Sequence, residues 1–149
     1  MLSDLPLIEE LYMAPDAAWC FEALAPRSYS FWLDSGMDKQ KLGRWSFMGS
    51  DPFLVMRSRG DEITLIREGA EEKRRGNPFD LLGELLDEYK MKSRELPTPF
   101  AGGAVGYFSY DLCHFIEQLP AKAIDDLELP ECNLAFYDAV VAHDHQENK

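Results

Sequence analysis

Two aromatic-rich segments on either side of a polar loop place the strongest constraint on how this chain can fold. Tyr29, Phe31 and Leu33 recur at every second position. Trp45 and Phe47 repeat that spacing after the loop. A period of two is typical of a β-strand, because successive side chains point to opposite faces of the sheet. The sequence therefore predicts two strands that meet at a polar turn.

The predicted turn brings three kinds of polar group together. Asp34 and Ser35 lead into the loop, and Gly43 and Arg44 lead out of it. A carboxylate, a hydroxyl and a guanidinium between aromatic strands can form a small polar pocket with a stacking wall. Composition alone favours the alternative, in which Asp34 and Arg44 form a solvated ion pair beside a turn.

Length, charge and cysteine content exclude several classes of function. The 149 residues are 46% apolar, which is enough for one globular domain with its own core. Asp and Glu number 27 against 15 Lys and Arg, so the net charge of −12 would repel a phosphate backbone or an anionic membrane. We expect no nucleic-acid or membrane binding. Three widely spaced cysteines and the lack of a signal peptide or transmembrane run predict a cytoplasmic protein.

The remaining patterns predict an α+β fold, with a largely antiparallel sheet and two or three packed helices. Asp16 and Asn77 are expected to cap helices, because each precedes apolar residues at helical spacing. The other expected elements are an edge strand within residues 5–13, a hairpin with its turn at residues 60–61, a charged connector at 71–76, a surface connection at 90–99, a central strand within 99–111, helical turns at 112–119, an acidic loop at 120–130 and one last strand at 133–143.

Other candidate sites carry little weight. His143 and His145 would share one face of a strand and could bind a metal, but an exposed, frayed terminus is the favoured interpretation. Cys113 and His114 diverge on either a helix or a strand, so a thiol nucleophile is not expected there. The glycines within residues 99–111 lack the spacing of a nucleotide-binding loop. We therefore expect no catalytic or metal-binding residue in this chain.

Four motifs occur in order along the chain: residues 31–36 (FWLDSG), 43–52 (GRWSFMGSDP), 99–111 (PFAGGAVGYFSYD), and Tyr137-Asp138 with Asp144-His145. Together they resemble the N-terminal region of component I of the chorismate-aminating enzymes, aminodeoxychorismate synthase and anthranilate synthase. The resemblance implies that residues 1–149 form the N-terminal portion of a larger component I fold. It also implies that the C-terminal chorismate-binding domain, with its Mg²⁺ carboxylates and, in aminodeoxychorismate synthases, a catalytic-region lysine, is absent from this chain. No cofactor is then expected here, and the chain alone should be inactive.

The resemblance further implies half of an effector pocket for L-tryptophan. In the family this site serves feedback inhibition in anthranilate synthases and holds a structural ligand in some aminodeoxychorismate synthases. The matching residues here are Leu33, Asp34, Ser35, Gly43, Arg44 and Trp45. Ser35 and nearby amides would take the carboxylate, Asp34 the ammonium, and Trp45 the ring. Trp45 stands where Tyr or Phe is common, and the missing region would supply the other wall, so weak binding is expected.

The two branches of the family remain open. The sequence Leu33-Asp34-Ser35-Gly36 favours aminodeoxychorismate synthase and folate biosynthesis, where Leu-Asp-Ser-Gly is more usual. Anthranilate synthases typically carry Leu-Leu-Glu-Ser where this chain has Trp32-Leu33-Asp34-Ser35. Anthranilate synthase in tryptophan biosynthesis is the alternative. Two other classes also remain open, a stand-alone module that binds an aromatic amino acid and a docking domain for the glutamine amidotransferase subunit. Apolar surface left exposed without the catalytic region should cause self-association.

Overall fold

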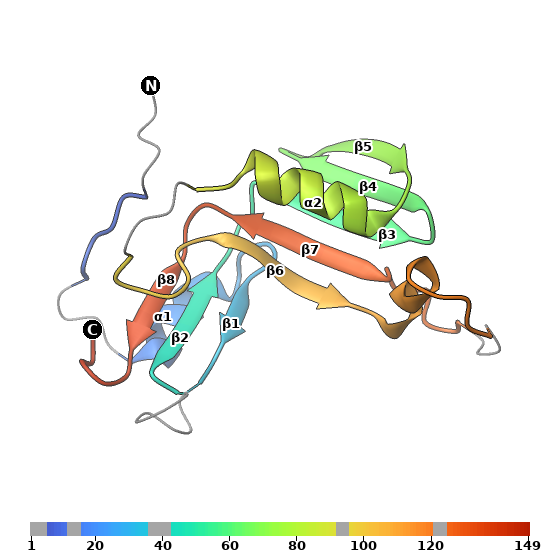
Figure 1. Cartoon of the computed structure of the whole chain (residues 1–149). Coiled ribbons are helices and arrows are strands. Elements are labelled where there is room, and N and C mark those ends of the chain that lie inside the picture. Colours follow the sequence, from blue (N-terminus) through green and yellow to red (C-terminus); the bar gives the residue numbers. More distant parts are fainter. Residues whose placement is uncertain (1–5, 12–15, 36–42, 92–95, 121–124) are drawn as a thin grey trace. The chain divides into compact units, whose positions relative to one another are not determined.

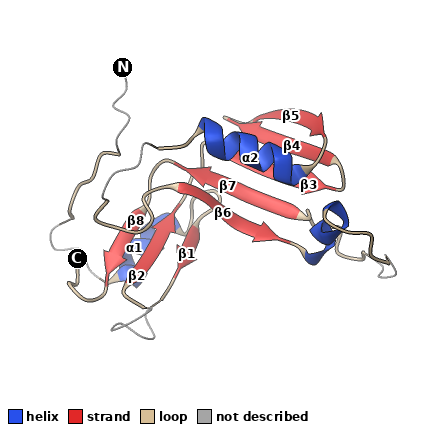
Figure 2. Cartoon of the chain, viewed as in Figure 1, coloured by secondary structure: helices blue, strands red, loops and turns tan. Residues whose placement is uncertain are grey.

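The computed structural model describes residues 6–11, 16–35, 43–91, 96–120 and 125–149. The chain forms two compact units, each with an antiparallel sheet (Figure 2). The first unit contains residues 1–52, 90–103 and 137–149, and the second contains residues 53–89 and 104–136. The fold is α+β, as predicted. Among the described residues, no helix is long and apolar enough to span a membrane.

The first unit is built on a three-stranded sheet in the order β1-β2-β8. The strands are β1 (Phe31–Leu33), β2 (Trp45–Gly49) and β8 (Val141–Asp144). Both neighbouring pairs are antiparallel, so β2 lies between two partners. The strand pair predicted around the polar loop is confirmed, although residues 36–42 of the loop itself lie outside the described residues.

Helix α1 (Ala17–Leu24) belongs to the same unit and begins as predicted. The Asp16 side chain accepts a hydrogen bond from the Trp19 amide at 3.0 Å, which satisfies one of the free amides at the helix start. The ring of Phe21 on this helix packs against Trp32 of β1, with centroids 5.3 Å apart. Trp32 lies opposite Met48, which is fully buried. Helix α1 therefore packs on the face of the sheet that carries Met48.

The second unit is a five-stranded sheet in the order β5-β4-β3-β7-β6. Its strands are β3 (Leu54–Arg59), β4 (Glu62–Arg67), β5 (Ala70–Arg75), β6 (Gly103–Phe108) and β7 (Cys132–Tyr137). Helix α2 (Pro78–Glu88) lies along one face of this sheet, and the short 3₁₀ helix η1 (Tyr110–Phe115) follows β6 (Figure 1). The buried core of the unit comprises Leu54, Met56, Ile63, Leu65, Leu81, Leu85, Leu112, Cys132, Leu134 and Phe136.

Helix α2 is confirmed in its start and its buried face. The Asn77 side chain accepts from the Phe79 amide at 2.9 Å, and Pro78 occupies the first turn, where a missing amide hydrogen costs nothing. Leu81 and Leu85 are buried against the sheet. The hairpin between β3 and β4 is also confirmed, with Gly60 at positive φ in its turn.

The prediction that residues 71–76 form a charged connector is wrong, because residues 70–75 form β5, paired antiparallel with β4. Glu68 and Gly69 both have positive φ, which gives the tight turn that a two-residue hairpin requires. Every residue of β5 is exposed, so its charges need no burial. Lys73 pairs with Glu62 across the hairpin at 3.4 Å. The tight turn thus pairs these residues with β4 as a strand, although their charged composition is typical of a loop.

Three other expectations about strands also need correction. Residues 133–143 form not one strand but two, β7 and β8, in different sheets, because the chain leaves the ladder after Tyr137. The strand within residues 99–111 lies at the edge of its sheet rather than at the centre. Residues 6–11 contain no strand, and the rest of the edge strand expected within 5–13 falls on residues outside the description.

Candidate effector site

Ser46 is the centre of the polar cluster in the first unit. It is the second residue of β2 and has no exposed surface. Its Oγ lies 2.7 Å from Asp34 Oδ1, 2.7 Å from His145 Nε2 and 3.3 Å from the Ser35 amide nitrogen. The register explains the meeting: Leu33 pairs with Phe47, so the next residue of the chain, Asp34, comes beside Ser46.

The hydrogen-bond roles in this cluster follow from the single hydrogen of a hydroxyl. Ser46 donates to the Asp34 carboxylate, so it can only accept from its two other partners. The Ser35 amide is one of these donors, and His145 Nε2–H is the other. His145 Nε2 also lies 3.9 Å from Asp34 Oδ1, which adds an ion pair when the imidazole is protonated at both nitrogens. Because Ser46 is inaccessible, its hydroxyl holds Asp34 in place and cannot attack a substrate.

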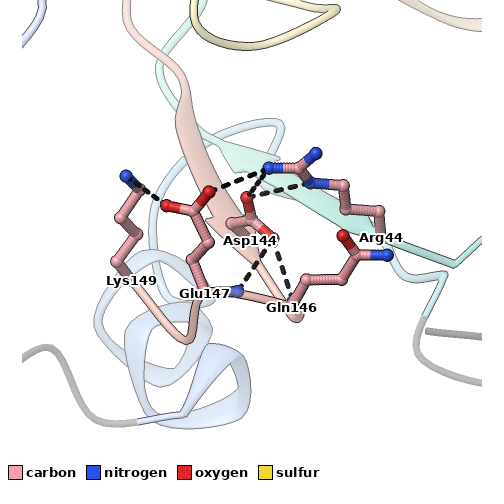
Figure 3. Close-up of polar contacts among 5 residues, drawn as sticks. All are labelled: Arg44, Asp144, Gln146, Glu147 and Lys149. Carbon is pink, nitrogen blue, oxygen red and sulfur yellow. Dashed lines mark hydrogen bonds and ion pairs between the residues drawn. The ribbon is translucent and has the colours of Figure 1, made fainter. Parts of the chain in front are cut away.

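Arg44 does not pair with Asp34, contrary to the interpretation that composition favoured. Its Nε and Nη2 donate to Asp144 Oδ2 at 3.0 and 2.6 Å, and Nη2 lies 3.3 Å from Glu147 (Figure 3). Asp144 is 1% exposed, and its other oxygen accepts from the amides of Gln146 and Glu147. The partner of Arg44 therefore comes from a strand one hundred residues further along the chain.

These contacts shift the pKa values of both charged groups. The hydrogen bond from Arg44 is the largest cause that lowers the pKa of Asp144, and the two backbone amides lower it further against the opposing effect of burial. The same hydrogen bond raises the pKa of Arg44. Both groups are therefore charged at neutral pH. The pair ties the start of β2 to the end of β8, and the His145 amide reinforces this by donating to the Arg44 carbonyl at 2.8 Å.

The end of the chain is ordered around this pair, so the prediction of an exposed, frayed terminus is wrong. His143 is 6% exposed, and the Asp144 amide donates to the Lys149 carbonyl at 2.9 Å. The His143 and His145 rings meet edge to face with centroids 4.7 Å apart. Across the described ranges, no group of three or more His, Cys, Asp and Glu side chains is placed to bind a metal ion.

An aromatic surface lies on the other face of β2. The rings of Trp45 and Phe47 stack with centroids 6.4 Å apart, and Phe100 meets Phe47 edge to face at 5.5 Å. The guanidinium carbon of Arg44 lies 5.1 Å from the centroid of the Trp45 ring, within the range of a cation–π contact. This face can therefore offer an aromatic wall beside a guanidinium whose charge is paired with Asp144 and Glu147.

The structure thus places four of the six predicted residues in two groups at one end of the sheet. Asp34 and Ser35 join the Ser46 cluster, whereas Arg44 and Trp45 belong to the aromatic face. Leu33 is 48% exposed, and Gly43 is buried. Sequence reasoning missed Ser46 as the centre of a cluster, and Asp144 and His145 as partners. The register of the predicted strand pair could have placed Ser46 beside Asp34. No feature of the sequence near these residues indicates that β8 supplies Asp144 and leads to His145.

Comparison with known proteins gives a consistent set of relatives. The chain is 37% identical over 131 residues to anthranilate synthase component 1 of Acetivibrio thermocellus, which covers 87% of this chain and 26% of that protein. It is 31% identical over 147 residues to aminodeoxychorismate synthase component 1 of Klebsiella aerogenes, covering 97% of this chain and 32% of that protein. The Bacillus subtilis aminodeoxychorismate synthase component 1 is 32% identical over 129 residues, 85% of this chain and 26% of that protein. No family model matches the sequence.

A solved structure shows the same fold. The structure of anthranilate synthase component I from Streptococcus pneumoniae TIGR4 superposes with a TM-score of 0.57 over 72% of this chain and 23% of that one, at 23% identity. Fold and relatives together identify the chain as a homologue of part of the component I proteins. It is a homologue of anthranilate synthase component I and of aminodeoxychorismate synthase component I, and it spans 20 to 32% of the length of the first relatives that it matches.

Proposed function

We propose that this chain is the N-terminal domain of aminodeoxychorismate synthase component I, which aminates chorismate with ammonia on the route to para-aminobenzoate and folate. The observation that carries the proposal is the match over 97% of the chain to the Klebsiella aerogenes aminodeoxychorismate synthase component 1. Leu33-Asp34-Ser35-Gly36 supports the same branch. The alternative branch is anthranilate synthase component I, and the higher identity of 37% to the Acetivibrio thermocellus protein supports it.

The chain's proposed contribution is one side of a pocket for L-tryptophan or a related amino acid. Asp34 is 53% exposed and is oriented by the Ser46 hydroxyl, so it can receive an ammonium group. Trp45 lies on the opposite face of β2 from Asp34, so the ligand would have to extend around the start of β2 for its ring to contact Trp45 and its carboxylate to contact Arg44, whose charge is shared with Asp144 and Glu147. The Ser35 amide already donates its hydrogen bond to Ser46 Oγ, so the Ser35 hydroxyl is the group of this residue that remains for the ligand. Leu33 and Gly43 would complete this side.

The chemistry is assigned to the part of component I that lies outside this chain. Mg²⁺ would assist the chorismate reaction there, and the described residues of this chain place no cluster of three ligands for it. A glutamine amidotransferase subunit would deliver the ammonia. The free thiols of Cys113 and of the buried Cys132 support a reducing, cytoplasmic location for this assembly.

Product analysis tests the proposed branch. The chain would be produced together with the polypeptide encoded immediately downstream of Lys149, in frame or as a separate gene, and supplied with chorismate, Mg²⁺ and ammonia. The expected product is 4-amino-4-deoxychorismate, identified by its mass and by conversion to para-aminobenzoate with the lyase. Anthranilate as the product would establish the alternative branch. A confirmed complex that consumes no chorismate would refute both.

Binding calorimetry with L-tryptophan tests the alternative that the chain is a stand-alone module that binds an aromatic amino acid. Only one side of the pocket is present, so the expected result for residues 1–149 is weak binding or none. Sub-micromolar binding by this chain alone would refute the half-pocket proposal and support a self-sufficient module. Glutamine amidotransferase docking is tested separately, by co-purification of that subunit with the chain.

A further inference from the structure

The two edge strands of the second unit differ sharply in how they are protected. β5, at one edge, has five charged residues among its six, Glu71 to Arg75, and all six are exposed. β6, at the other edge, has none, and no charged residue occurs between positions 99 and 110. Edge strands are usually protected from pairing with other chains by charge, proline or a covering element. Within the described part of the chain, β5 has this protection and β6 does not.

Apolar side chains are exposed along the unprotected edge. Tyr107 and Phe108, at the end of β6, are 41% and 53% exposed. Because successive strand residues point to opposite faces, both faces of the sheet are apolar at this edge. Tyr110 and Ile116, which follow in and after η1, are 82% and 74% exposed. Exposed apolar groups gathered on one edge indicate a surface that binds another polypeptide.

The inner side of β6 is held firmly to β7, so the strand can act as a rigid template. A Cβ atom on Gly106 would lie 1.9 Å from the Asn133 carbonyl oxygen, which shows how closely the two backbones approach. The Ser109 amide donates to the Glu131 carbonyl at 2.6 Å, just beyond the strand. The Ser109 hydroxyl is buried and has no hydrogen-bond partner among the described residues.

We propose that the outer edge of β6 pairs with a strand from the rest of component I, the part of the family's chain that this sequence does not match. This inference rests on the proposed function. The first relatives are three to five times as long as the segment they share with this chain, so a partner of that origin is available. Main-chain hydrogen bonds would provide the affinity, and Tyr107 and Phe108 would give the contact its specificity. A second copy of this chain is disfavoured, because each copy carries a charge of −12.

Hydrogen exchange on the assembled protein tests this pairing. The chain would be co-expressed with the part of Klebsiella aerogenes aminodeoxychorismate synthase component 1 that lies outside the matched segment. The expected result is a 1:1 complex in which amides of β6 exchange at least about tenfold more slowly than in the isolated chain, while those of β5 are unchanged. Any self-association of the isolated chain through β6 should disappear when the partner is added.

Two substitutions and a matched control make the test specific. Tyr107→Lys adds a positive charge to the proposed interface and should weaken the complex by about tenfold or more. Tyr110→Ala, at a residue that is 82% exposed, tests the same surface with little risk to folding. Ala70→Lys makes the same change in charge on the β5 edge and should leave the affinity unchanged.

The outcomes separate this inference from the proposed function. A complex whose β6 amides exchange as in the isolated chain, or which tolerates both tyrosine substitutions, would overturn the pairing while leaving the proposed function intact. A β6-mediated homodimer that the partner cannot displace would identify a second copy as the occupant instead. Failure to form any complex would overturn both proposals.

Discussion

Replacing Ser46 by alanine provides the most direct test of the polar cluster, because three hydrogen bonds end on its one oxygen. Asp34 and Ser35 are exposed, so water can replace the bonds that they lose. His145 has a side chain that is only 10% exposed, so its Nε2–H would lose its partner with little access to water. An unsatisfied buried donor costs about 1–3 kcal/mol, and loss of the partly screened bond to a carboxylate adds about 1 kcal/mol.

We therefore expect Ser46→Ala to lower the free energy of unfolding by about 2–4 kcal/mol, which corresponds to a fall in Tm of roughly 4–16 °C for a chain of this size. Tryptophan fluorescence during urea unfolding is the appropriate assay, because Trp19, Trp32 and Trp45 all lie in the first unit. The decrease should come from the midpoint of the transition, with an unchanged slope.

Ser58 supplies a matched control in the second unit. It is equally buried, at 2% exposed, but its hydroxyl has no hydrogen-bond partner. Ser58→Ala removes an unsatisfied polar group, so it should be neutral or slightly stabilising when unfolding is followed by circular dichroism. If Ser46→Ala changed stability by less than about 0.5 kcal/mol, or no more than Ser58→Ala, the cluster would be incidental and our account of Asp34 orientation would be wrong.

Three further predictions follow from single contacts. Arg44 lowers the folded-state pKa of Asp144, so the stability from this pair is complete above the ordinary aspartate pKa of about 3.9 and is lost as pH falls through the lower folded value. Asp144→Asn should therefore reduce the change of the urea unfolding midpoint with pH between about pH 5 and pH 2. Gly106→Ala should destabilise the chain by several kcal/mol or prevent folding, because the new Cβ would overlap the Asn133 carbonyl. Gly83→Ala, on the exposed face of α2, meets nothing within 4 Å and should stabilise the chain by about 0.5–1 kcal/mol. Thermal melts of both variants measure the difference. Burial raises the pKa of Cys132 to about 11, so its thiol should react last with iodoacetamide in peptide mapping; labelling of Cys132 at the rate of the other two would contradict its burial.

Elements with strong local signals could be predicted from the sequence. Helix α2 has a capping residue, a proline in its first turn and an apolar stripe, and each of these acts within a few residues. The β3–β4 hairpin has a glycine at its turn and apolar residues on either side. In both places local propensity and burial favour the same conformation, so the sequence pattern and the structure agree.

Elements that depend on neighbours far away in the sequence could not be predicted in the same way. β5 has the composition of a loop and becomes a strand because the turn at Glu68 and Gly69 folds it back on β4. The edge position of β6 depends on which strands pair, and that order is not a property of the segment itself. Residues 133–143 form a continuous apolar run, but the change of sheet after Tyr137 divides it.

The candidate site shows the same division at the level of single residues. The predicted turn did place Asp34 and Ser35 at one end of the sheet, because the strand pair fixes its own register. Arg44 took a partner from β8 instead of the nearby Asp34, since Asp144 is buried and already holds two backbone amides that favour its charged form. An isolated pair beside a turn could not compete with that arrangement.

The position of β2 between β1 and β8 explains why the last residues of the chain matter for a site first recognised near its beginning. A strand in the middle of a sheet presents the same side chain to both neighbours, so Ser46 can contact Asp34 on one side and His145 on the other. A ligand that draws Asp34 towards its ammonium group would therefore act on β8 through a hydroxyl that has a single hydrogen to donate.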